Sequence, residues 1–113
     1  MAMTFYHNPR CSKSRAALEL LRTKGVSVRL VEYLQTPPDI AELRSLAGML
    51  GGARAIVRDG EPAYREAGLG PSSSDQELLD AVVRHPILLQ RPILVRDGKA
   101  AIGRPPEAVL ALL

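Results

Sequence analysis

The first third of the chain combines short apolar runs with one segment of helical periodicity. Residues 3–6 (Met-Thr-Phe-Tyr) are apolar and aromatic, which predicts a strand. In residues 12–24 the apolar side chains recur every three or four positions, and Gly25 is a suitable residue to follow a helix. Residues 26–30 alternate between apolar and polar side chains, and residues 31–34 continue the run, which predicts a second strand. This order predicts a βαβ unit with two parallel strands.

Helical patterns dominate the middle of the chain. Residues 36–50 are expected to form a helix with Thr36 as its N-cap and a proline in its first turn. Residues 53–57 and 61–67 are expected to form shorter helices. A further helix is expected over residues 74–85, because Ser-Asp-Gln-Glu at its start has capping-box spacing.

The last quarter of the chain has the pattern of a hairpin followed by a helix. Apolar residues 93–95 and 100–102 flank Asp97-Gly98, and this dipeptide between two apolar runs is a strong hairpin signal. Pro105-Pro106 is expected to start a final helix that ends at Leu113.

The predicted elements together indicate an α/β fold. The βαβ unit plus a C-terminal ββα unit gives a mixed four-stranded sheet with helices on its faces, which is the thioredoxin-like arrangement. At 113 residues the chain is long enough for one domain with its own core. Thioredoxin-like folds place a cis-proline opposite the residue that acts as their nucleophile. We therefore expect a cis bond between Arg91 and Pro92.

Composition narrows the function classes. The net charge of +3 is spread along the chain, and with 4% aromatic residues and no Trp a stacking platform for nucleic acid is not expected. One cysteine excludes an intramolecular disulfide, a CxxC pair and a Cys-rich zinc site. No apolar window is long enough for a membrane span, and residues 1–4 do not begin a signal peptide. A cytoplasmic protein without membrane association is therefore expected.

The single cysteine, Cys11, lies where the first strand gives way to the first helix. Unpaired N–H groups and the positive end of the helix dipole favour a thiolate there, and Arg10, Lys13 and Arg15 add positive charge. A lone cysteine is more commonly a small inert core residue. The polar and basic surroundings of Cys11 favour a reactive thiol instead.

Spacing excludes several other sites. A Cys-x5-Arg phosphatase loop would need arginine where the chain has Ala17, and neither GxGxxG nor a Walker loop occurs. His7 and His85 are too few and too far apart to suggest a metal site. A Cys-His-Asn hydrolase could pair Cys11 with either histidine, but nothing marks a substrate cleft. Ser14 takes the second place of a Cys-x-x-Ser pattern, so another molecule must resolve a Cys11 disulfide.

Motifs with a recognisable pattern extend along nearly the whole chain. They are Tyr6-His7-Asn8-Pro9 with Cys11 and Ser14-Arg15, Tyr33-Leu34 with Thr36-Pro37-Pro38, Arg54 with Arg58, His85-Pro86-Ile87-Leu88, Arg91-Pro92-Ile93, and Gly103-Arg104-Pro105. Together they resemble one family, the glutaredoxin-coupled arsenate reductases and their ArsC/Spx-like relatives. The resemblance implies a thioredoxin-like core of about residues 1–36 and 91–113, with a helical insertion of about residues 37–90.

The resemblance also implies Cys11 as the nucleophile and three oxyanion-binding arginines, Arg58, Arg91 and Arg104. Guanidinium groups offset the repulsion between a thiolate and an anion, although each arginine could also be an ordinary surface charge.

A second set of residues would support the thiolate loop: His7, Asn8, Ser14 and Arg15. His7 would tune the thiol or order the loop, or be a hydrogen-bonded structural histidine. Ser14 would donate to the Cys11 sulfur or, with Ser12 as the other candidate, cap the helix.

The expected function is reduction of arsenate to arsenite through a Cys11 adduct resolved by glutathione and glutaredoxin, without a metal or a tightly bound cofactor. Ser12-Lys13 stands where the better-known reductases carry Gly-Thr. Two alternatives therefore stay open. One is a glutathione-linked monothiol oxidoreductase without arsenate turnover, and the other is an Spx-like regulator that binds RNA polymerase. A regulator of that type would more naturally carry a CxxC switch, which Ser14 removes.

Overall fold

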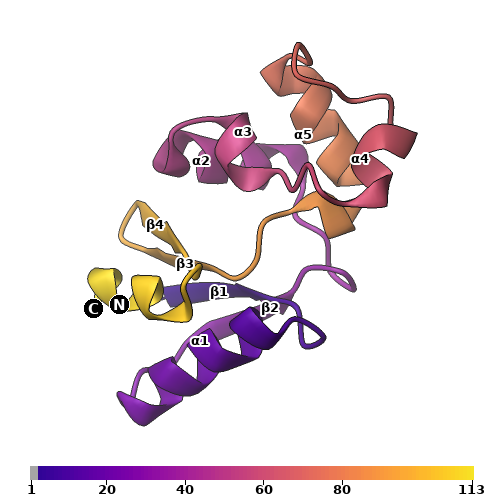
Figure 1. The fold of residues 1–113 in the computed structure, drawn as a ribbon. Helices are drawn as coiled ribbons and strands as arrows, with labels where there is room; N and C mark the ends of the chain where they lie inside the picture. Colours follow the sequence, from indigo (N-terminus) through magenta and orange to yellow (C-terminus); the bar gives the residue numbers. More distant parts are fainter. Residues whose placement is uncertain (1–2) are drawn as a thin grey trace. The chain divides into compact units, whose positions relative to one another are not determined.

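The computed structural model describes residues 3–113. Met1 and Ala2 lie outside the described residues, and they belong to residues 1–4, which are not expected to begin a signal peptide. The elements are β1 (Met3–His7), α1 (Ser12–Thr23), β2 (Arg29–Glu32), α2 (Ile40–Leu50), α3 (Ala53–Ile56), α4 (Pro62–Glu66), α5 (Asp75–Arg84), the 3-10 helix η1 (Pro86–Leu88), β3 (Ile93–Arg96), β4 (Lys99–Ile102) and the 3-10 helix η2 (Pro106–Leu112) (Figure 1). They form two compact units, called here unit 1 (Met1–Thr36 with Arg91–Leu113) and unit 2 (Pro37–Gln90).

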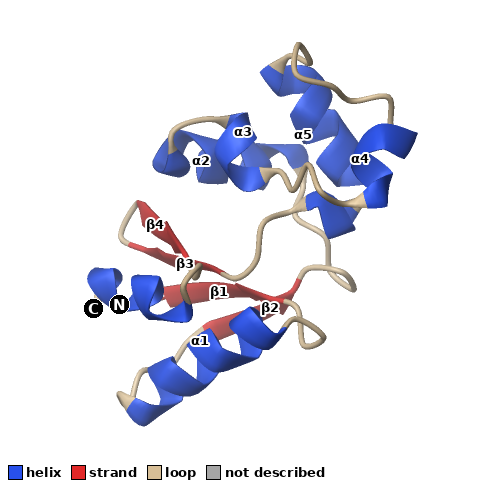
Figure 2. Ribbon diagram, in the orientation of Figure 1, coloured by secondary structure: helices blue, strands red, loops and turns tan. Residues whose placement is uncertain are grey.

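Unit 1 contains a mixed four-stranded sheet in the order β2-β1-β3-β4 (Figure 2). β1 and β2 are parallel, with Thr4 opposite Arg29 and His7 opposite Glu32. β3 is antiparallel to both β1 and β4. The mixed four-stranded sheet expected from the sequence is therefore confirmed.

One face of this sheet carries the core of unit 1. Phe5 and Leu94 from the sheet, Ala17 and Leu21 from α1, and Val109 from η2 are all fully buried in one cluster. The apolar face of α1 arises from the helical spacing of these side chains, and it anchors the helix against β1. This packing fixes the loop between β1 and α1, which carries Cys11.

The hairpin between β3 and β4 turns at Asp97 and Gly98, whose φ angles are 52° and 75°. Positive φ at both central residues suits the twist of a two-residue hairpin, as Asp-Gly predicts. The Arg91–Pro92 bond is cis, which confirms that prediction, and Arg104–Pro105 is cis as well.

Unit 2 is helical and has its own buried apolar residues. Leu43 and Leu46 of α2, Ile56 of α3 and Leu78 of α5 are buried. The predicted capping box at the start of α5 is present. No helix among residues 3–113 is both long and apolar enough to cross a membrane.

The structure differs from the sequence prediction in the bounds of the second strand, the type of the final helix and the N-cap of α2. The second strand spans Arg29–Glu32 and not residues 26–34, because these four residues pair with β1. Val26 and Val28 pack against the core of unit 1 without joining the strand, and residues 33–35 form a turn. The final helix is a 3-10 helix, in which the Ala108 N–H donates to Pro105 O at 2.9 Å.

The N-cap of α2 was also predicted wrongly. Asp39 caps the helix, accepting from the Glu42 N–H at 2.9 Å, whereas the Thr36 hydroxyl donates to Glu32 O at 3.3 Å. Prolines 37 and 38 explain the shift. A residue that precedes proline is held in extended backbone. Pro37 precedes Pro38, so it does not adopt the helical angles that a helix capped by Thr36 would require.

Candidate functional site

Cys11 is the N-cap residue of α1, with extended backbone angles (φ −93°, ψ 122°). Its N–H donates to Asn8 O at 3.0 Å, and its carbonyl accepts from the Arg15 N–H at 3.0 Å. The thiol is partly exposed. β1 and α1 thus hold the sulfur at the first turn of a helix, where backbone N–H groups have no partner within the helix.

The surroundings of the sulfur favour the thiolate. Partial burial alone would raise the pKa of Cys11, but it is outweighed by hydrogen bonds from the Ser14 N–H, the Arg91 side chain and the Lys13 N–H, and by the Arg91 charge. Taken together, these contributions lower the pKa of Cys11 from its ordinary value. The predicted direction is confirmed, and a depressed pKa is the mark of a nucleophilic cysteine.

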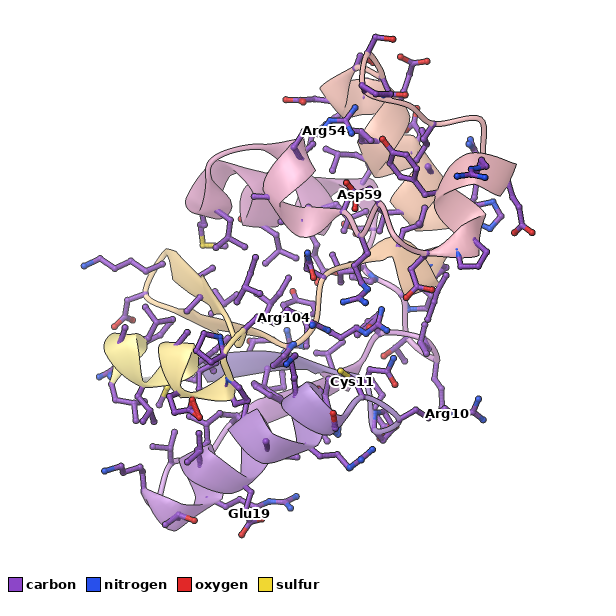
Figure 3. The ribbon with its side chains drawn as sticks, viewed as in Figure 1. Arg10, Cys11, Glu19, Arg54, Asp59 and Arg104 are labelled. Carbon is purple, nitrogen blue, oxygen red and sulfur yellow. The ribbon has the colours of Figure 1, made fainter. Side chains whose placement is uncertain are left out.

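Two of the three predicted arginines meet at this sulfur. Arg104 Nη2 lies 3.7 Å from Cys11 Sγ, and Arg104 Nε donates to the Arg91 carbonyl at 2.9 Å. Figure 3 shows Arg104 beside Cys11, while the neighbouring Arg10 points away from the sulfur. Two guanidinium groups therefore border the thiol of unit 1.

His7, Asn8 and Ser14 form a buried hydrogen-bonded cluster behind the loop. Ser14 Oγ accepts from the Asn8 N–H at 3.0 Å and lies 2.7 Å from His7 Nδ1. Neither Ser12 nor Ser14 caps α1 through its side chain, so that alternative was wrong. The reason is that Ser14 points into the protein, where its hydroxyl holds the loop to β1.

The electrostatics of His7 favour a neutral ring. Burial lowers the pKa of His7 from its ordinary value, the charges of Arg22 and Arg15 lower it further, and Glu32 acts in the opposite sense. A neutral imidazole beside Ser14 can order the loop through a hydrogen bond without placing a positive charge in the interior.

Hydrogen bonds from α1 and within the loop close the loop on its exposed side. Arg15 Nη1 donates to Pro9 O at 2.8 Å, and Asn8 Oδ1 accepts from the Arg10 N–H at 3.0 Å. These bonds fold residues 8–11 into a tight turn. All four residues expected to support the thiolate loop thus contact it or each other.

The third arginine, Arg58, belongs to unit 2 and to a different set of contacts. Arg58 Nε lies 3.2 Å from Glu61 Oε1, and Arg58 Nη1 lies 3.5 Å from Gln90 Oε1. Sequence reasoning did not single out Glu61, although its spacing of three residues from Arg58 was a signal for an ion pair. The oxyanion role of Arg58 stays a prediction.

Two further candidates have local partners within unit 2. Arg54 donates to the Tyr64 hydroxyl at 2.7 Å and to Gly70 O, so it ties α4 and the following loop to α3. His85 is the C-cap of α5. Among residues 3–113, no three His, Cys, Asp or Glu side chains gather closely enough to hold a metal ion.

The arrangement around Cys11 suits attack on an anion. A thiolate is a nucleophile, and guanidinium groups beside it can hydrogen bond oxyanion oxygens and offset the repulsion between two negative reactants. Because the sequence has one cysteine, a disulfide formed at Cys11 must involve a thiol from another molecule.

Comparison with known proteins agrees with this geometry. The chain matches the ArsC family over residues 6–112. It is 49% identical over 111 residues to the arsenate reductase of Neisseria meningitidis serogroup A, with 96% of this chain and 95% of that protein covered. It is 51% identical over 111 residues to the uncharacterized protein YfgD of Escherichia coli K12, with 96% and 93% covered.

A solved structure extends the likeness to the fold. The arsenate reductase from Vibrio cholerae superposes with a TM-score of 0.94 at 44% identity, covering 100% of this chain and 98% of that one. The fold is therefore thioredoxin-like, as the order of the elements predicts. With a family match that spans residues 6–112 and relatives near 50% identity over almost their whole length, the chain belongs to the ArsC family.

Proposed function

We propose that this protein is a cytoplasmic arsenate reductase that uses Cys11 as its nucleophile and glutathione and glutaredoxin as its thiol donors. The observation that carries the proposal is the contact between Arg104 and the Cys11 sulfur, with Arg91 as the second cation. Relatives named arsenate reductase at 49% and 44% identity support arsenate as the substrate.

The first step forms an arsenic–sulfur bond. The Cys11 thiolate attacks arsenic(V), and one arsenate oxygen leaves as water after taking up two protons. Arg91 and Arg104 hydrogen bond the remaining oxygens and offset their charge as the adduct forms. Arg58 is the third proposed ligand of these oxygens.

The second step carries the redox change. A glutathione thiolate attacks the Cys11 sulfur, a sulfur–sulfur bond forms, and the arsenic–sulfur bond breaks. Its electron pair stays on arsenic, which leaves as arsenite(III), and two thiols have been oxidised to a mixed disulfide. The glutaredoxin thiolate then attacks the glutathione sulfur and releases Cys11 as a thiolate. The single cysteine supports this dependence on external thiols.

An assay with purified protein tests the proposal. Arsenate, glutathione, glutaredoxin and a coupled NADPH-dependent glutathione reductase should give arsenite and consume one NADPH for each arsenate reduced. The Cys11→Ser variant should be inactive, and omission of glutaredoxin should slow turnover. Reduction of a small glutathione mixed disulfide in the absence of glutaredoxin, without any arsenite in the complete assay, would instead favour the monothiol oxidoreductase.

A further inference from the structure

The backbone around Arg58 is held firmly within unit 2. The Arg58 N–H donates to Leu88 O at 2.7 Å, and the Gln90 N–H donates to Ile56 O at 2.8 Å. Val57 and Leu89 form an antiparallel bridge between these two bonds. The origin of the Arg58 side chain is therefore fixed against the segment that leads to Gln90.

The Arg58 side chain is paired with a carboxylate. Its Nε lies 3.2 Å from Glu61 Oε1, and the two side chains are only 24% and 19% exposed. Glu61 is the N-cap residue of α4, yet its side chain makes no capping hydrogen bond. The carboxylate therefore pairs with the guanidinium and does not cap the helix.

This pairing has a cost if Arg58 binds an oxyanion. A tetrahedral dianion would need the same cation that Glu61 neutralises, and it would lie close to a second negative charge in a partly buried place. Coulomb repulsion between near charges is larger there than in bulk water, because the surroundings are less polarisable. Glu61 Oε1 also uses Nε–H, one of the five donors of the guanidinium.

We propose that Glu61 is an internal counterion of Arg58 that competes with the oxyanion and so weakens the affinity of the site for tetrahedral anions. This inference rests on the proposed role of Arg58 as an oxyanion ligand. Glu61 is a positioning residue, because it acts through Arg58 and not on the reacting atoms. Glu61 keeps the Arg58 guanidinium oriented when no anion is bound, and it weakens the hold of Arg58 on an anion that binds.

Sulfate binding tests the inference, because sulfate is a tetrahedral dianion that the proposed reaction does not reduce. Calorimetric titration would compare wild type with Glu61→Gln, Glu66→Gln, Arg58→Ala and the Arg58→Ala/Glu61→Gln double variant. Glu66 is the matched control, since it is an exposed glutamate on the same helix and its substitution makes the same change in charge.

The expected result is tighter sulfate binding by Glu61→Gln, by about threefold to tenfold, as loss of a partly buried charge pair would give. Glu66→Gln should stay within about twofold of wild type, because exposed charges are screened. In the Arg58→Ala background, Glu61→Gln should have no effect. The KM for arsenate should fall by the same factor as the sulfate Kd, with kcat lowered or unchanged.

Several results would overturn the inference. The inference fails if Glu61→Gln and Glu66→Gln bind sulfate with equal affinity. It also fails if neither wild type nor Glu61→Gln binds sulfate, or if the effect of Glu61→Gln persists without Arg58. Weaker binding by Glu61→Gln at unchanged Tm would mean that the carboxylate only orients Arg58. Absence of arsenate turnover in wild type would refute the proposed function alone, since sulfate binding is measured without turnover.

Discussion

Arg104 reaches the sulfur of Cys11 across 93 residues of sequence, with Nη2 3.7 Å from Sγ. The same guanidinium donates through Nε to the Arg91 carbonyl at 2.9 Å, which fixes its plane. β1 carries the loop of Cys11 and pairs with β3, while Arg104 follows β4 on the other side of β3. The sheet therefore sets the distance between the thiol and its neighbouring cation.

Replacement of either arginine at the sulfur should reduce arsenate turnover. Arg91→Ala and Arg104→Ala should each cost about 2–4 kcal/mol of transition-state stabilisation, as for the loss of one oxyanion donor. Lysine variants should recover only part, because an ammonium does not reproduce the planar fork. Exposed Arg29 on β2 supplies the control, and Arg29→Ala should match wild type in kcat/KM. Turnover that survives both alanine variants would make these arginines surface charges.

The thiol should react as a thiolate below the pH of an ordinary cysteine. The rate of Cys11 alkylation by iodoacetamide should rise with pH and reach its midpoint below ~8.5, the unperturbed thiol pKa. Arg91→Ala should move this midpoint upward, because a hydrogen bond and a positive charge that lower the Cys11 pKa are lost. A midpoint near ~8.5 in wild type would show that the helix N-terminus and Arg91 do not stabilise the thiolate.

The stability of the fold should decrease in mild acid because of His7. The pKa of His7 is lowered, mainly by burial, so the unfolded chain binds this proton more readily than the folded protein. The contribution is fully present above ~6.5, the unfolded pKa, and is lost as pH falls toward the lower folded pKa. Urea midpoints of wild type and His7→Gln between about pH 7.5 and 5 should converge as pH falls. A constant difference would rule out this linkage.

Removal of the buried hydroxyl of Ser14 should destabilise the protein and loosen the thiolate loop. Ser14→Ala takes away the acceptor of the Asn8 N–H and the partner of His7 Nδ1, and a buried group left without its partner costs about 1–3 kcal/mol. Ser12→Ala, at an exposed position of the same helix, should change the free energy of unfolding by less than about 0.5 kcal/mol. Similar losses in both variants would show that the buried hydrogen bonds of Ser14 do not account for the effect.

Two glycine substitutions should have opposite effects. A Cβ at Gly103 would lie 2.6 Å from Pro92 Cγ and 3.2 Å from Val109 Cγ1, so Gly103→Ala should destabilise unit 1 by about 1–3 kcal/mol through overpacking. Gly48 lies within α2 with nothing within 4 Å of such a Cβ, so Gly48→Ala should stabilise by about 0.5–1 kcal/mol. Denaturant midpoints measure both, and a neutral Gly103→Ala would mean that Pro92 moves freely.

The sequence by itself determined the elements whose cause is local. Apolar spacing specified α1, Asp97-Gly98 specified the β3–β4 hairpin, and Ser74 with Glu77 specified the start of α5. The position of Cys11 at the start of a helix also followed from neighbouring residues, and the Ser14 and Lys13 N–H groups there help to lower its pKa, whereas the hydrogen bond and charge of Arg91 that lower it further come from a distant segment. Such features depend on a few consecutive residues, so their physical causes are visible in the chain alone.

Only the tertiary structure decided how each of several polar side chains is used. Ser14 was open to a capping role, but its buried position beside His7 gives its hydroxyl another partner. Arg58 was predicted as an anion ligand, and the fold adds Glu61 as its counterion. β2 ends where β1 ends, so pairing and not apolar pattern sets its length. A side chain's partner depends on which segments the sheet and helices bring together. No local sequence pattern contains the distances between residues that are far apart in the chain.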